Sequence, residues 1–231
     1  MPTEPTMLQN STLDFLGNLA RNNNREWFNT NKTAYLAAKE DVEAFTAALI
    51  REASRFDPLL ADLLPKNCLF RIYRDTRFSK DKTPYKTHMG LWLCPSGRNS
   101  NGPGYYLHIT PGASFLAGGY WMPPADDLKA IRQEIDYNST ALKQLLEANS
   151  FRKYFGGLDE EHALKTAPQG YPKDHPEIAL LKLKSFTVSH PFKDMVLTTP
   201  KAARTVAAGW AALAPLNQFL RSATDVASQQ F

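Results

Sequence analysis

Apolar residues recur at intervals of three to four positions in several long stretches, which is the spacing of an amphipathic helix. The longest run predicts a helix over about residues 33–56. A shorter run predicts an earlier helix over about 11–20, with Ser11 or Thr12 as its N-cap. Further runs predict helices over about 124–135, 139–149, 176–184 and 200–227. Of these, Asp174 is expected to cap the helix at 176–184, and Pro215 to kink or interrupt the last one.

Between the two groups of helices the pattern changes to short apolar stretches that alternate with polar residues. These predict strands over about 68–78, 86–94, 105–110 and 114–121, with a fifth short strand over 185–189. Short links between consecutive strands favour antiparallel pairing. The expected class is therefore α+β, with an antiparallel sheet of about four to five strands, roughly residues 68–121, packed with N-terminal and C-terminal helices. Residues 1–231 are expected to form a single domain, with 1–10 as a disordered tail.

The first predicted strand alternates between two kinds of side chain. Phe70, Ile72, Arg74, Thr76 and Phe78 share one face of a strand, which reads as the core face. Arg71, Tyr73, Asp75 and Arg77 share the other, which reads as a polar face. Arg74 stands on the apolar row, so it either reaches solvent near the end of the strand or meets a buried acceptor. Residues 79–84 end the pattern as a loop.

Charge is concentrated in this same segment. Residues 71–88 contain six basic and two acidic residues, whereas the whole chain contains 27 Lys and Arg and 23 Asp and Glu, for a net charge of +4. Removing the segment leaves 21 of each sign, so the entire net charge lies within it. Like charges this close repel one another unless an anion offsets them. The segment therefore predicts a binding site for an anion.

The expected site places the anion between Arg71 and Arg77, whose side chains lie about 7 Å apart if the segment is a strand. The lysines that follow close over the same anion, and Asp75 orients the arginines or acts as a base with His108. The alternative is a structural network of salt bridges with helix carboxylates such as Glu26 or Asp41. The predicted ligand-binding residues are Arg71, Tyr73, Arg74, Asp75, Arg77, Lys80, Lys82, Lys86 and His108.

Catalytic candidates are limited to Asp75 and His108, and the sequence does not decide whether the protein is an enzyme. His108 falls on the polar side of its predicted strand with Tyr106 and Thr110. A histidine in that position serves as a general acid or base, or simply as a hydrogen-bonding residue. His88 follows the basic segment and is a further residue that can join the site.

Several kinds of site find no support in the sequence. No pair of Cys and His residues has zinc spacing, and the chain has no phosphate-binding glycine loop and no serine-hydrolase elbow. We therefore expect no metal and no cofactor. The two cysteines, Cys68 and Cys94, stand among apolar residues and are expected to be buried thiols. No signal peptide and no apolar run of about 20 residues is present, so a cytoplasmic protein without a membrane span is expected.

The basic segment also carries a resemblance. The string RIYRDTRFSKDKTPYKTH, with NNNREWFNTNKTAY before it and PQGYPKDHPEIALLKLKSF after it, resembles a widespread family of conserved hypothetical proteins that is labelled only as a domain of unknown function. The resemblance covers nearly the whole chain and implies one domain with a shared site.

Three functions remain open from the sequence. The first is binding of a small anionic or phosphate-bearing ligand, with or without catalysis. The second is a nucleic-acid-binding module, and the third is a protein whose basic loop docks on an acidic partner. Confinement of the basic residues to one short segment favours the small ligand, because a nucleic-acid-binding surface usually spreads its cations over a longer face.

Overall fold

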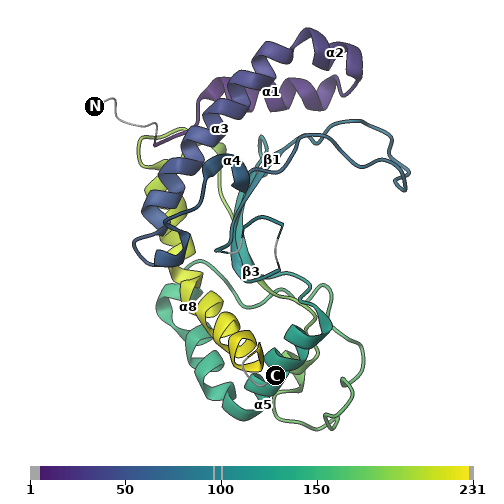
Figure 1. Ribbon diagram of the computed structural model, residues 1–231, viewed down its shortest axis with the longest axis vertical. Coiled ribbons are helices and arrows are strands. Elements are labelled where there is room, and N and C mark those ends of the chain that lie inside the picture. Colours follow the sequence, from purple (N-terminus) through teal and green to yellow (C-terminus); the bar gives the residue numbers. More distant parts are fainter. Residues whose placement is uncertain (1–5, 96, 100, 229–231) are drawn as a thin grey trace. The chain divides into compact units, whose positions relative to one another are not determined.

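The computed structural model describes residues 6–95, 97–99 and 101–228 and has the predicted α+β class (Figure 1). Its antiparallel sheet has four strands in the order β1-β2-β3-β4. The strands are β1 (Met89–Leu93), β2 (Gly104–Ile109), β3 (Phe115–Tyr120) and β4 (Phe186–Pro191). The expected number of strands is confirmed, and β4 corresponds to the short strand expected over 185–189, so the sheet extends beyond residues 68–121.

By their internal contacts, the residues group into two compact units. Unit 1 comprises Met1–Arg98, Tyr106–Leu116 and Pro191–Ala208, and unit 2 comprises Asn99–Tyr105, Ala117–His190 and Gly209–Phe231. The chain passes from one unit to the other inside β2, β3 and β4 and inside helix α8 (Ala202–Ser228). The single domain expected over residues 1–231 stays a prediction.

Unit 1 is built on helix α3 (Lys32–Ala53), against which α1 (Asn10–Arg21) and α2 (Arg25–Thr30) pack. Figure 1 shows these helices side by side. The unit also contains η1 (Pro58–Leu60), α4 (Pro65–Cys68), β1 and η2 (Asp194–Val196). Its core includes Phe15, Leu19, Phe28, Val42 and Phe45.

The start of α1 differs from the prediction. The N-cap is Gln9, whose side chain makes no capping bond, so neither Ser11 nor Thr12 is the cap. Asp41 on α3 takes that role, because one carboxylate oxygen accepts the Gln9 N–H at 2.9 Å and the Thr12 hydroxyl at 2.5 Å. The hydrogen-bond acceptor for the start of α1 therefore comes from a neighbouring helix. Capping rules based on sequence look for that acceptor in the N-cap residue or the first turn of the helix itself.

Residues 6–10 do not form the expected tail. Leu8 is 1% exposed, and its N–H donates to the Leu197 carbonyl at 2.8 Å. The Thr6 carbonyl accepts the Ala203 N–H at 3.0 Å. Burial of one leucine and two backbone bonds fix this segment, and the expectation for residues 1–5 lies outside the described residues.

Unit 2 contains α5 (Ala125–Glu147), α6 (Asn149–Arg152), α7 (Ile178–Leu181) and most of α8. The two helices predicted over about 124–135 and 139–149 are the two halves of α5, which meet at a kink where Asn138 leaves helical geometry. Pro215 lies inside α8 without ending it. The predicted cap Asp174 is wrong, because α7 is short and begins after Glu177 without a side-chain cap.

The predicted strand over 68–78 is also wrong. Cys68 ends α4, and only Leu69 and Tyr73 make isolated antiparallel bridges, to Leu91 and Tyr85. The expected core row fails as well, because Phe70 is 40% exposed and Phe78 is 96% exposed. From residue 74 onward the chain forms a long loop that projects beyond β1 (Figure 1).

The reason for this loop is local hydrogen bonding by aspartates. Asp75 accepts the Arg77 N–H at 3.2 Å, and Asp81 accepts the Thr83 N–H at 2.9 Å. Such bonds satisfy backbone donors within the loop and compete with a sheet ladder.

Two simpler predictions can be compared directly with the structure. Cys68 and Cys94 are buried, as the sequence predicts. Among the described residues, no helix combines the length and the apolar character needed to cross a membrane.

Candidate functional site

The basic segment begins as two chain stretches that run alongside each other in unit 1. The Phe70 N–H donates to the Gly90 carbonyl at 2.9 Å, and the Lys86 N–H donates to the Ile72 carbonyl at 2.7 Å. The Arg74 N–H donates to the Pro84 carbonyl at 3.0 Å. These bonds and the buried side chain of Ile72 hold Phe70 and Arg71 at the edge of β1.

A pocket of about 240 Å³ opens at this place. No acidic side chain lines it, and its apolar wall consists of Tyr35, Leu69, Phe70, Ile72, Tyr73, Met89 and Gly90. The remaining lining residues are four cations, Lys39, Lys66, Arg71 and Arg98. A concave site with this lining suits an anionic group attached to an apolar body.

Two cations lie close to the aromatic ring of Phe70. The Lys86 ammonium lies 5.6 Å and the Arg98 guanidinium carbon 5.8 Å from the Phe70 ring centroid. Burial lowers the pKa of Lys86, and the charges of Arg71 and Arg98 lower it further. Within the described part of the chain, the side chains of Arg71 and Lys86 have no ion-pair or hydrogen-bond partner. The charges of Arg71 and Arg98 therefore repel that of Lys86, and no carboxylate of a described residue forms an ion pair with Arg71 or Lys86.

Arg98 also supports the backbone of the pocket, because its guanidinium donates to the Leu69 carbonyl. This bond directs the side chain of Arg98 toward the segment that carries Phe70 and Arg71. Sequence reasoning missed Arg98, since it falls in a stretch rich in Gly, Ser and Asn that reads only as a turn.

His108 lies on the half-buried side of β2 with Tyr106, as its alternation predicts. The His108 Nδ1 atom and the Tyr106 hydroxyl are 3.0 Å apart, and Phe115 stacks on the imidazole with a centroid distance of 4.7 Å. Burial lowers the pKa of His108 and raises that of Tyr106 to about 12. The imidazole is therefore neutral near pH 7 and held in one orientation.

His88 packs against His108. Their ring centroids are 4.1 Å apart, and burial, followed by the charges of His108 and Lys86, lowers the pKa of His88 to about 4. The group connects to the pocket through Phe70, whose ring centroid lies 6.2 Å from that of Tyr106. The aromatic rings of Tyr106 and Phe70 thus lie between His108 and the cation cluster.

The rest of the basic segment lies in the loop and is largely neutralised by its own residues. Arg74 binds Asp81 and Thr83, so it is held by an acceptor, but a largely exposed one. Arg77 makes two hydrogen bonds to Asp75, at 3.0 and 2.7 Å. The Lys82 ammonium donates to the Thr76 carbonyl at 2.9 Å. Lys80 is exposed and does not line the pocket.

Asp75 is therefore a partner of one arginine. Hydrogen bonds from the Arg77 side chain and backbone lower the pKa of Asp75, and the charge of Arg71 lowers it slightly more. A carboxylate with a lowered pKa is a poor base. Neither Glu26 nor Asp41 pairs with the segment, and Asp41 instead caps α1.

Tyr73 lines the pocket from a separate aromatic group. Its ring packs against Phe28 and Tyr85 at centroid distances of 6.0 and 5.5 Å, and its hydroxyl accepts the Lys32 ammonium at 3.3 Å. The structure thus divides the predicted site residues into three groups. Arg71 and Tyr73 line the pocket, Lys86 and His108 stand beside it, and Arg74, Asp75, Arg77, Lys80 and Lys82 belong to the loop.

No group of three or more His, Cys, Asp or Glu side chains is arranged to hold a metal ion in the part of the chain that the structure describes.

Comparison with known proteins gives one match. No curated protein and no solved structure matches the chain. Residues 11–219 match the model of the family described as "Conserved hypothetical protein (DUF2461)", which is most of the chain. The chain therefore belongs to this family of conserved hypothetical proteins.

Proposed function

We propose that the pocket beside β1 binds a small anionic ligand that carries a phosphate or carboxylate group on an apolar or aromatic body. The observation that carries this proposal is the lining of the pocket, which contains four cations, no carboxylate and a wall of aromatic and aliphatic side chains. Arg71 offers a planar fork of N–H donors that matches a phosphate or carboxylate. Phe70 and Tyr73 offer aromatic surface to the rest of the ligand.

The cost of assembling the cations supports the same proposal. Arg71, Lys86 and Arg98 raise the free energy of one another's charged forms, and an anion that lies among them lowers it. The lowered pKa of Lys86 reflects this mutual repulsion together with burial. A bound phosphate reverses the effect and stabilises all three charges.

If the ligand reacts, His108 is a better proton acceptor than Asp75. The neutral imidazole of His108 is held by Tyr106 beside Phe70, whereas Asp75 is exposed and occupied by Arg77. The proposal itself concerns binding.

Nucleic-acid binding by the loop is the second candidate. Phe78 is 96% exposed in the basic loop, and the Arg77 guanidinium carbon lies 5.9 Å from its ring centroid. An exposed aromatic ring beside cations is the arrangement on which an unpaired base stacks. The internal pairs Asp75–Arg77 and Asp81–Arg74 weaken this candidate, because they use up charge that a phosphate backbone needs.

One titration separates the two functions. Phenyl phosphate and a single-stranded oligonucleotide are each titrated into the protein and into the variants Arg71→Gln and Arg77→Gln, with binding measured by calorimetry. In Arg71→Gln, the loss of a charge-assisted hydrogen bond is expected to lower the affinity for phenyl phosphate by roughly tenfold to a hundredfold. Arg77→Gln is the matched control from the same segment, and its affinity for phenyl phosphate should stay unchanged.

The opposite pattern assigns the function to the loop. Oligonucleotide binding that falls steeply with salt and is lost in Arg77→Gln and Phe78→Ala supports nucleic-acid recognition. Absence of phenyl phosphate binding to the unaltered protein, or equal binding by Arg71→Gln, contradicts the pocket.

A further inference from the structure

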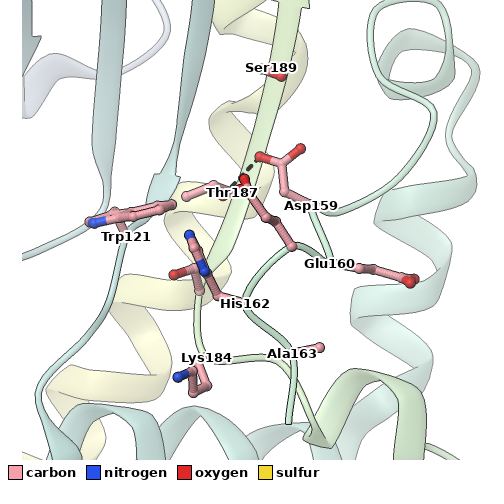
Figure 2. Close-up of a pocket in the computed structure, with 10 residues that line it drawn as sticks. Trp121, Asp159, Glu160, His162, Ala163, Lys184, Thr187 and Ser189 are labelled. Carbon is pink, nitrogen blue, oxygen red and sulfur yellow. Dashed lines mark hydrogen bonds between the residues drawn. The ribbon is translucent and has the colours of Figure 1, made fainter. Parts of the chain in front are cut away.

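A second pocket lies wholly within unit 2 and shares no residue with the anion pocket (Figure 2). Its volume is about 260 Å³. This is slightly below the range of about 300–1,000 Å³ that is usual for drug-sized ligands, so the pocket suits a smaller molecule.

Trp121 forms one wall of this pocket and is 57% exposed. It directly follows β3, and His162 packs against it in a T-shaped arrangement with a centroid distance of 5.0 Å. The next residue, Met122, has a φ of 44°, and its N–H donates to the Ser185 hydroxyl at 3.0 Å. A left-handed conformation is unfavourable for methionine and persists mainly where function requires it. The backbone thus fixes a large aromatic side chain at the pocket while leaving it open to solvent.

The opposite wall offers both hydrogen-bond donors and acceptors. The Thr187 hydroxyl donates to one carboxylate oxygen of Asp159 at 2.9 Å, and Figure 2 shows this pair beside Trp121. The second Asp159 oxygen accepts no hydrogen bond from a described residue. Ser185 is 4% exposed, and its oxygen accepts the Met122 N–H while its own proton has no acceptor among the described residues.

Charge in the pocket disfavours an anion. An anion meets Asp159, and a cation meets the ammonium group of Lys184, which also lines the pocket. The carboxylate of Glu160 points away from Trp121 in Figure 2, so it adds little to the interior. Glu161 also lines the pocket, so carboxylates outnumber the ammonium group of Lys184, and the lining offers hydrogen-bond donors and acceptors together.

We propose that this pocket binds a neutral sugar. Each sugar hydroxyl both donates and accepts, so it needs the mixture that Asp159, Lys184 and Ser185 provide. The C–H face of a sugar ring is weakly positive because oxygen atoms withdraw its electrons, and the indole face is negative, so the two surfaces attract. The ring of Trp121 stacks on that C–H face, and the free oxygen of Asp159 accepts from a hydroxyl at the ring edge.

The test uses the full chain labelled with ¹⁵N, in which the four tryptophans give separate indole N–H signals. Trp121→Phe identifies the Trp121 signal by its disappearance. Glucose, galactose, mannose, N-acetylglucosamine and ribose are added in turn, followed by tetramethylammonium and inorganic phosphate. We expect at least one sugar to shift the Trp121 signal to saturation and to leave the signals of Trp27, Trp92 and Trp210 in place.

Variants then test the contacts by ligand-observed binding. Trp121→Ala is expected to lower the affinity for the sugar at least about tenfold. Trp121→Phe keeps an aromatic face and is expected to retain most of the affinity. Asp159→Asn should also weaken binding. Tyr137→Ala is the matched control, because Tyr137 is 86% exposed in the same unit and lies outside the pocket.

Three results overturn the proposal. They are an unmoved Trp121 signal with every sugar, a shift by tetramethylammonium or phosphate alone, and undiminished sugar binding by Trp121→Ala. Because Trp121 is exposed, we expect Trp121→Ala to fold. If it does not fold, Trp121→Phe and Asp159→Asn test the same contacts.

Discussion

His88 is the residue whose environment most alters its chemistry. It packs against His108, and burial is the main reason that its pKa falls from 6.5 to about 4. The unfolded chain therefore takes up a proton at His88 at a higher pH than the folded protein does. The contribution of His88 to the free energy of unfolding is complete above the pKa that His88 has in the unfolded chain. It is lost as the pH falls toward the pKa that His88 has in the folded protein.

We predict that His88→Gln reduces the loss of stability between about pH 6.5 and pH 4, because glutamine cannot take up that proton. The difference between the two proteins across this window should be about 1–3 kcal/mol, allowing for partial exposure of the ring to solvent. Urea unfolding at several pH values measures it. His175→Gln is the control, because His175 belongs to unit 2, where it pairs with Asp136 at 2.9 Å. Parallel curves for His88→Gln and the unaltered protein contradict the prediction.

At the level of elements, β3 depends on glycine for its approach to β4. Gly119 has a φ of 110°, and a Cβ atom built on it stands 2.0 Å from the Phe186 carbonyl oxygen. No side chain fits at that distance, and the clashing atom belongs to the backbone of the neighbouring strand. The glycine thus permits the ladder between β3 and β4 that places Trp121 and Thr187 in the same unit.

Gly119→Ala should therefore destabilise the protein by at least about 3 kcal/mol, the upper end of the usual cost of overpacking. Gly157→Ala is the matched control, because Gly157 has no positive φ and no neighbour within 4 Å of a built Cβ atom. Thermal melting of both variants checks the contrast. Similar melting temperatures for the two would show that β3 and β4 can separate without cost.

At the level of the whole molecule, the boundary between the two units falls inside regular elements. Independent domains are usually joined by exposed linkers, whereas here β2, β3, β4 and α8 each contribute residues to both units. Loss of any of these elements removes part of each unit. The single domain expected over residues 1–231 remains a prediction, and an unfolding experiment tests it.

We accordingly predict one cooperative unfolding transition. Single-tryptophan variants that retain only Trp92, in unit 1, or only Trp210, in unit 2, should report the same denaturant midpoint by fluorescence. The calorimetric enthalpy should equal the van't Hoff enthalpy. Separate midpoints for the two reporters would establish two independently folding units.

The sequence by itself determined the features that depend on neighbours along the chain. It predicted α3 from the period of its apolar residues and β2 from the alternation of Tyr105, Leu107 and Ile109. It also showed the concentration of charge in residues 71–88. The same period rule failed at residues 68–78, where pairing with residues 84–91 ends at Arg74 and Asp75 then accepts the Arg77 N–H within the loop. Alternation alone does not separate a strand from a loop that uses its own side chains as acceptors.

Only the tertiary structure decided which charges stand together. It divided the basic segment into a self-paired loop and a pocket edge, and it brought Lys39, Lys66 and Arg98 to Arg71 from distant parts of the chain. It likewise brought Asp159 and Thr187 to Trp121. Such groupings arise from packing between segments that are far apart in sequence. The period of the side chains and the composition describe only the order of residues along the chain, so they do not predict these groupings.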